Sequence, residues 1–174
     1  MRKNYLLFMF VWLPLATMFA EEPKRIMESL SMTSVILGQE VNYSVVLPLD
    51  YYSSNKTYPV VYLLHGLGDN ESSWLEYGLI AQIGDAAVAA KEIVPMIFVM
   101  PQGFRNYYVN DYAGSFRYED MFVQELVPFI DKTYRTIPDH THRATMGYSM
   151  GGFGALMLPA RHQDVFSVSV PLSI

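Results

Sequence analysis

Hydrophobic and polar positions along the chain predict strands and helices in alternation. Residues 41–47 are rich in valine and partly alternating, which is typical of a strand. Residues 59–64 and 93–100 are continuous apolar runs, as expected of strands that are covered on both faces. Residues 143–148 and 165–170 predict two further strands.

Helical patterns separate these strands. Residues 72–77 predict a short helical turn, and the Ala-rich residues 79–91 predict a helix. Residues 118–134 carry apolar side chains at a helical spacing. Pro128 within this segment predicts a kink or a break. Residues 150–161, small and apolar, predict the helix that follows the strand at 143–148.

This order of elements predicts an α/β fold with a mostly parallel sheet and helices on both faces. Ligands bind beyond the carboxyl ends of the strands in such sheets. The segments after Leu64 and after Tyr148 are therefore the first places to search for a site. Residues 101–116 predict a long loop, and a loop of that length inside a compact domain is often functional.

Composition narrows the function classes. Of the 174 residues, 51% are hydrophobic and 17% charged, which is typical of a globular chain. The net charge is −5, and no run of Lys or Arg occurs, so nothing suggests nucleic acid as a partner. The chain has no cysteine, which excludes disulfides, thiolate metal sites and a cysteine nucleophile. No histidine pair has a helical ligand spacing, so we expect no metal and no cofactor.

The first 20 residues predict a signal peptide. Arg2 and Lys3 precede an apolar run over residues 5–19, and Ala20 precedes polar residues. An uncleaved anchor is the alternative, but the run is shorter than the roughly 20 residues that span a bilayer. We therefore expect a secreted or periplasmic protein without a stable membrane anchor after cleavage.

Residues 147–151, Gly-Tyr-Ser-Met-Gly, form a GxSxG motif. The motif stands between a predicted strand and a predicted helix, which is the context that supports Ser149 as a nucleophile on a sharp turn. Chance would produce about 0.06 such matches in a chain of this size. The alternative is a glycine-rich turn that serves packing alone.

An oxyanion hole needs two backbone donors near that serine. The N–H of Met150 opens the predicted helix and is one candidate. The second should come from the segment after the strand at 59–64, where the N–H of Leu67 is the best placed. We expect His65, Gly66 and Tyr148 to lie against the substrate; an ordinary glycine turn is the alternative for residues 65–68.

Four stretches of the chain resemble the esterase D-like, or putative esterase, family of α/β-hydrolases. That family includes feruloyl esterases, S-formylglutathione hydrolase, enterochelin esterases and mycolyltransferases. The resemblance covers residues 35–174 and implies the α/β-hydrolase fold with ester chemistry at Ser149. It also implies that Glu119 gives structural support near the site, although an acid at a helix start also interacts favourably with the helix dipole. The four stretches are YPVVYLLHGLGDNESSW, FVMPQGF, DYAGSFRYEDMFVQELVPFID and TMGYSMGGFGAL.

The triad Asp and His are not found where this fold has them. Both should follow the nucleophile in the sequence, where only His162 and Asp164 are available. These two residues follow the helix that leads away from Ser149, so we expect neither to act in catalysis. His140 and His142 precede the strand that leads to Ser149, about 20 Å from the site. We therefore expect residues 21–174 to be the N-terminal portion of a single, C-terminally truncated domain.

The resulting hypothesis is an exported serine esterase that acts on small-molecule or carbohydrate-linked esters, such as feruloyl or acetyl groups. One alternative is an acyltransferase that uses the same serine. Another is a non-catalytic module that binds carbohydrate or protein. Aromatic side chains in and after the long loop would stack on sugars or acyl groups, or else cover the edge of the core. They are Tyr107, Tyr108, Tyr112, Phe116 and Tyr118.

Overall fold

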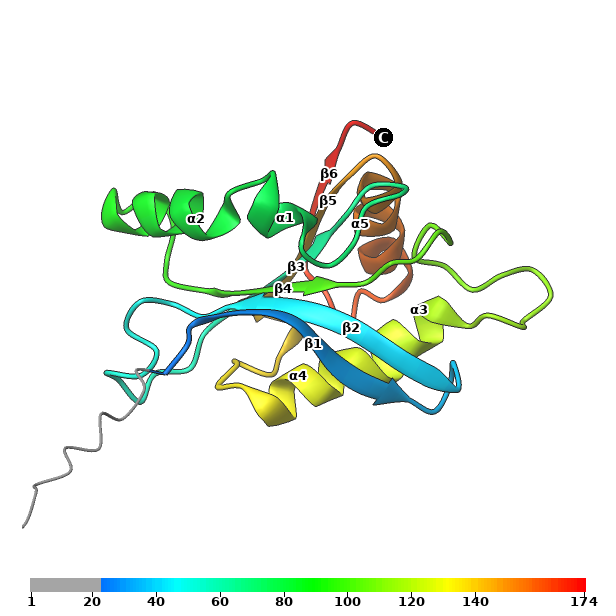
Figure 1. Ribbon diagram of the computed structural model, residues 1–174, viewed down its shortest axis with the longest axis horizontal. Coiled ribbons are helices and arrows are strands. Elements are labelled where there is room, and N and C mark those ends of the chain that lie inside the picture. Colours follow the sequence, from blue (N-terminus) through cyan, green and yellow to red (C-terminus); the bar gives the residue numbers. More distant parts are fainter. Residues whose placement is uncertain (1–22) are drawn as a thin grey trace, which may run out of the picture.

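The computed structural model describes residues 23–174, so the predicted signal peptide, residues 1–20, lies outside the described residues. Within this described part of the chain, six strands form one sheet in the order β1-β2-β4-β3-β5-β6 (Figure 1). The strands are β1 (Ile26–Ser34), β2 (Gln39–Val46), β3 (Val60–Leu64), β4 (Ile97–Pro101), β5 (Arg143–Tyr148) and β6 (Val168–Leu172). The longer helices are α2 (Ile80–Ala89), α4 (Val127–Thr133) and α5 (Met150–Arg161). The shorter ones are α1 (Ser73–Glu76), α3 (Tyr118–Met121), the π-helical turn η1 (Phe122–Leu126) and the 3-10 turn η2 (His140–His142).

The sheet is mostly parallel, as predicted. Strands β4, β3, β5 and β6 run parallel to one another, whereas β1 and β2 add an antiparallel edge. The register pairs Leu64 of β3 with Gly147 of β5. The segments that follow these two strands therefore leave the sheet at the same edge, which is the carboxyl edge of the parallel strands.

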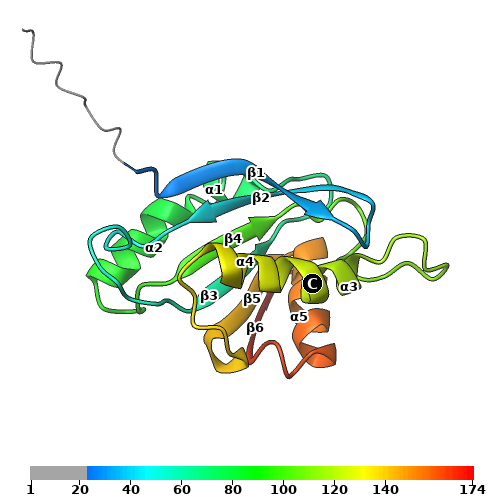
Figure 2. The same ribbon diagram turned by 90° about the horizontal axis from the view of Figure 1, so that it is seen from below.

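Successive side chains of the central strands pack alternately into two separate hydrophobic cores, one on each face of the sheet. In β3, Tyr62 and Leu64 pack among the side chains of α3, α4 and α5, whereas Leu63 packs against α1 and α2. In β4, Val99 and Phe98 divide in the same way. Because both faces are buried, these strands are apolar throughout. The helices accordingly cover both faces of the sheet (Figures 1 and 2), and the predicted fold class is confirmed.

Strand β1 is the element that the sequence pattern did not predict. Its inward side chains include Leu30, Met32 and Ser34, which alternate with exposed neighbours. A register shift between Met27 and Leu30, with Ser29 at a φ of 48°, interrupts the alternation. A β-bulge of this kind shifts the inward-facing positions by one residue. The short polar sequence around it therefore lacks a clean two-residue period.

Prolines explain two further differences. Strand β4 begins at Ile97, later than predicted, because Pro95 has no N–H to donate to a neighbouring strand. Pro128 does not break its helix. It stands at the start of α4, directly after η1, where the Val127 N–H donates to the Phe122 carbonyl five residues earlier. This π-helical turn takes up the irregularity that the proline imposes.

The last strand also differs from its prediction. Strand β6 covers residues 168–172, slightly later than predicted, and lies at the end of the sheet. Val168, Val170 and Leu172 are partly exposed there. Of the helices formed by residues 23–174, none is long and apolar enough to cross a membrane.

Candidate active site

Ser149 occupies a strained turn between β5 and α5. Its φ is 54° and its ψ is −119°, a conformation that L-residues rarely adopt. Such strain costs of order 1–3 kcal/mol and persists only where the surroundings enforce it. The side chain is exposed and caps no amide of α5. The hydroxyl is therefore presented outward at the carboxyl edge of the sheet.

Close backbone packing enforces this turn and explains its glycines. A Cβ added at Gly147 would lie 2.2 Å from the carbonyl oxygen of Gly151. One added at Gly151 would lie 2.1 Å from the Leu64 oxygen and 2.7 Å from the His65 oxygen. No side chain fits at either position. The start of α5 is thus pressed directly against the end of β3.

That contact brings the segment after β3, which contains Leu67, close to the start of α5, where Met150 lies. Met150 is the first residue of α5, so its N–H has no acceptor within the helix. Leu67 follows β3 by three residues, and its side chain is exposed beside the turn that Asp69 closes by donating its N–H to the Gly66 carbonyl. Both residues therefore lie at the same edge of the sheet, and their role as oxyanion donors stays a prediction.

His65 is the first residue of the segment after β3, residues 65–68, and is 1% exposed. Its Nδ1 is 2.8 Å from the Gly66 carbonyl oxygen. Its Nε2 is 2.8 Å from the backbone nitrogen of Gly103 and 2.9 Å from the side-chain oxygen of Gln102. Because both ring nitrogens are engaged inside the protein, His65 connects the segment after β3 to the segment after β4.

Glu71 and Gln102 complete this connection, and sequence reasoning missed both. The Gln102 side chain donates to Glu71, which is 6% exposed. Ser29 of β1 donates to the other oxygen of the same carboxylate. The network thus runs from the antiparallel edge to the loops at the carboxyl edge. Glu71 lies in the turns after the buried strand β3, and Gln102 directly follows the buried strand β4. This position after a buried strand is the only sequence signal for either residue.

Tyr148 packs against the core on the side of α1 and α2, and its hydroxyl reaches the loop after β3. Its hydroxyl donates to Asp69 at 2.7 Å, and its ring lies edge-on to Trp74 at 5.3 Å. Burial, followed by the hydrogen bond to Asp69, raises the pKa of Tyr148 to about 12. Beside this ring lies a hollow of about 300 Å³ that Ser73, Tyr77 and Gly78 also line. The residue before Ser149 therefore forms one wall of this hollow.

The histidines other than His65 lie away from Ser149, as expected. His162 ends α5, whose 12 residues place it about 18 Å along the helix. Its Nε2 pairs with Glu119 at 2.8 Å, and Arg161 pairs with the same carboxylate. Glu119 therefore supports the far end of α5, not the end that carries the nucleophile. His142 pairs with Asp139 at the amino end of β5.

The aromatic residues of the long loop divide into two groups. Tyr108 and Tyr118 are fully buried and belong to the core. Phe116 is partly buried and stacks on Tyr118 at 6.3 Å. Tyr112 is fully exposed, and Tyr107 is 46% exposed. Covering the core thus accounts for three of the five side chains, and only Tyr107 and Tyr112 present faces to solvent.

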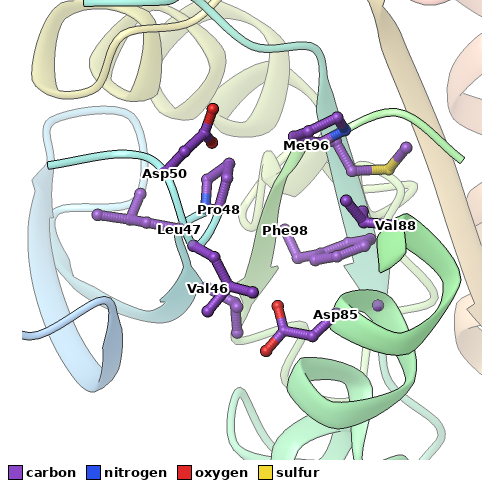
Figure 3. A pocket seen from close by; sticks show the side chains of 11 residues that line it. Val46, Leu47, Pro48, Asp50, Asp85, Val88, Met96 and Phe98 are labelled. Carbon is purple, nitrogen blue, oxygen red and sulfur yellow. The ribbon is translucent and has the colours of Figure 1, made fainter. Parts of the chain in front are cut away.

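A mostly apolar cavity of about 240 Å³ lies elsewhere (Figure 3). It opens between the end of β2, the side of α2 and the start of β4, at the edge of the sheet opposite Ser149. Asp50 and Asp85 border it, but Lys56 and Arg25 pair with these carboxylates. The remaining walls are apolar. This cavity takes no part in the site around Ser149.

Comparison with known proteins identifies the family to which the sequence is similar. A family model described as Putative esterase matches residues 34–173. An endo-1,4-β-xylanase/feruloyl esterase of Xylanibacter ruminicola is 35% identical over 136 residues, which are 74% of this chain and 19% of that protein. An esterase of Mycobacterium tuberculosis is 34% identical over 135 residues, which are 75% of this chain and 28% of that protein.

Solved structures agree with this comparison. A ferulic acid esterase is 37% identical with a TM-score of 0.74, over 79% of this chain and 56% of that one. The feruloyl esterase module of Clostridium thermocellum, solved with sinapinate, is 25% identical with a TM-score of 0.69, over 82% of this chain and 51% of that one. The chain thus spans about half the length of these solved structures, and less of the two related proteins.

Proposed function

The chain belongs to the putative esterase family, and from this membership we propose that it carries the nucleophile and oxyanion hole of a serine esterase. Ser149 Oγ attacks the carbonyl carbon of an acyl ester, and the N–H groups of Leu67 and Met150 hold the oxygen that becomes negatively charged. The bond to the alcohol then breaks, and water releases the acyl group from the serine. The strained turn at Ser149 is the observation that carries the proposal.

The serine proton needs a base, and the base needs an orienting acid. His65 is fully engaged inside the protein, and His162 is bound to Glu119 at the far end of α5. We therefore propose that the triad Asp and His come from chain outside residues 23–174. His65 acts instead as a positioning residue that fixes the segment of Leu67.

The strain at Ser149 also supports the enzyme over the non-catalytic alternative. A module that only binds carbohydrate or protein has no need of a serine with a φ of 54° that presents its hydroxyl outward. Strain of this kind is concentrated at functional sites. Hydrolysis and acyl transfer use the same serine, and a product analysis with water and an added alcohol as competing acceptors separates them.

We propose acyl esters linked to carbohydrate, with feruloyl or acetyl groups, as the substrate class. The relatives from Xylanibacter ruminicola and Clostridium thermocellum are feruloyl esterases by name, which supports the feruloyl group. We also propose export to the periplasm or the medium, which rests on the pattern of residues 1–20. N-terminal sequencing of protein recovered outside the cytoplasm checks export; recovery of the intact N-terminus in the cytoplasm alone would refute it.

The decisive test is Ser149→Ala in the longest form of the protein that its gene encodes. Hydrolysis of methyl ferulate and of acetylated xylooligosaccharides should fall by at least about 1,000-fold, because no nucleophile remains. Ser167→Ala, an exposed serine beyond the far end of α5, is the matched control and should keep the rate. Retention of the hydrolysis rate by Ser149→Ala would mean that the mechanism is wrong.

A further inference from the structure

The loop after β4 has an unusual backbone. Phe104, Tyr107 and Tyr108 all have positive φ angles, of 52°, 59° and 62°. Residues other than glycine rarely adopt such angles, and aromatic residues have no local hydrogen bond to favour them. Three of them within five positions indicate that the fold holds this loop in one arrangement. In Figure 1 the loop curls beside α5 before it extends away from the molecule.

Tyr108 is the anchor of this arrangement. It is fully buried, and its hydroxyl donates to the His65 carbonyl at 3.0 Å. Its ring fills the space that side chains at Gly103 and Gly154 would occupy, since a Cβ there would come within 2.4 Å and 2.6 Å of the ring. Tyr108 therefore holds the loop after β4 against both the segment after β3 and α5.

The neighbouring Tyr107 is consequently held at the surface. It is 46% exposed, and its ring lies edge-on to that of Phe153 at 5.8 Å. Phe153 is in the first turn of α5, and its N–H donates to the Ser149 carbonyl. Side chains of a helix lean toward its N-terminus. The ring pair of Tyr107 and Phe153 thus borders the turn that carries the nucleophile.

We propose that Tyr107 is a specificity-determining residue that contacts a flat apolar face of the ester substrate. The proposal rests on the proposed function of Ser149. A tyrosine ring gives a rigid apolar surface with a polar tip, which suits an aryl ring or the face of a pyranose. Tyr148 and the hollow beside it lie toward the loop after β3, whereas Tyr107 belongs to the loop after β4.

Tyr112 offers a matched control in the same loop. It is fully exposed and makes no ring contact with another aromatic side chain of the described residues. Its φ is not positive, so the backbone does not hold it as it holds Tyr107. Exposure of an aromatic ring is therefore common to both positions, and only the fixed place beside α5 distinguishes Tyr107.

The test measures kcat/KM for methyl ferulate, an acetylated xylooligosaccharide and ethyl acetate, which has no flat face. Tyr107→Ala should lower the preference for a flat-faced ester over ethyl acetate about tenfold, mainly through KM. Tyr107→Phe should keep most of this preference, and Tyr112→Ala should leave it unchanged. Loss with methyl ferulate alone assigns an aryl ring, and loss with the oligosaccharide alone assigns a pyranose.

Two outcomes overturn the proposal. One is an unchanged preference in Tyr107→Ala, and the other is an equal loss of kcat on all three esters, which would indicate general damage to the loop.

If the unmodified protein hydrolyses none of the esters, the function of Ser149 fails separately. In that case, binding of methyl ferulate and of the oligosaccharide to Ser149→Ala, with and without Tyr107→Ala, decides the role of Tyr107. Weaker binding of either ligand in the double variant supports it, and equal or absent binding refutes it.

Discussion

At the scale of single residues, the candidate site is defined by backbone positions more than by titratable side chains. Ser149 is presented by a strained turn, and Gly151 lets the backbone of β3 approach it closely. The proposed oxyanion donors are two N–H groups. The histidine nearest to the serine in this region, His65, is used to hold loops together. Chemistry at this edge therefore depends on the exact path of the main chain.

The raised pKa of Tyr148 gives a prediction for alkaline pH. Because its folded pKa of about 12 lies above the ordinary value of about 10, the neutral phenol is favoured in the folded state. Its contribution to stability is complete below pH 10 and is lost as the pH rises toward 12. The difference in unfolding free energy between the unmodified protein and Tyr148→Phe should thus be constant from pH 7 to 9 and shrink above pH 10.

Urea unfolding at a series of pH values measures this difference. A difference that grows above pH 10 would contradict the raised pKa of Tyr148. Tyr77→Phe is a suitable control, since Tyr77 is 79% exposed.

At the scale of elements, one carboxylate of the helical segment formed by α3, η1 and α4 supports the connection between β1 and β2. Glu125 in the π-helical turn accepts hydrogen bonds from the backbone nitrogens of Val35 and Ile36, at 3.0 and 3.1 Å, and from the Ser34 hydroxyl. These donors belong to the tight connection between β1 and β2. The irregular turn before Pro128 thus supports the antiparallel edge of the sheet.

Replacement of Glu125 tests this support. Glu125→Ala should lower the free energy of unfolding by about 1–3 kcal/mol, because three donors lose their acceptor. Gln124→Ala, at the exposed neighbouring position, should change it by less than about 0.5 kcal/mol. Chemical unfolding followed by circular dichroism compares the two. Equal effects of both substitutions would show that the Glu125 contacts contribute nothing.

At the scale of the whole molecule, the strands of the sheet differ in how deeply they are buried. Strand β3 lies between β4 and β5 and is almost completely buried. Strand β6 is paired on one side, by β5, and most of its residues are exposed. Protection of the backbone against solvent should therefore decline from the centre of the sheet toward β6.

Hydrogen–deuterium exchange on the 174-residue chain measures this decline. Amides of β3 should exchange at least about 100-fold more slowly than those of β6, since opening a central strand requires most of the global unfolding. The amides of β5 should fall between them. Equal protection of β3 and β6 would mean that β6 is covered in solution.

Sequence by itself determined the elements and the chemistry that depend on local patterns. A partly alternating run predicted β2 and a continuous apolar run predicted β3, because burial of one face or of both faces imposes these patterns wherever the backbone is regular. The GxSxG motif placed Ser149 between β5 and α5, where the structure has it. A strained turn between a strand and a helix is a local feature, so a short motif is enough to predict it.

Only the tertiary structure decided which distant residues meet. It joined His65 to Gly103, placed Glu119 at the far end of α5, and separated the buried Tyr108 from the exposed Tyr107 beside it. These outcomes depend on contacts between segments far apart in the chain, which no local period records. The bulge that interrupts the alternating pattern of β1 and the π-helical turn before Pro128 were likewise decided by the tertiary structure. Each is an irregularity of the backbone that side-chain packing selects and that the local sequence pattern does not record.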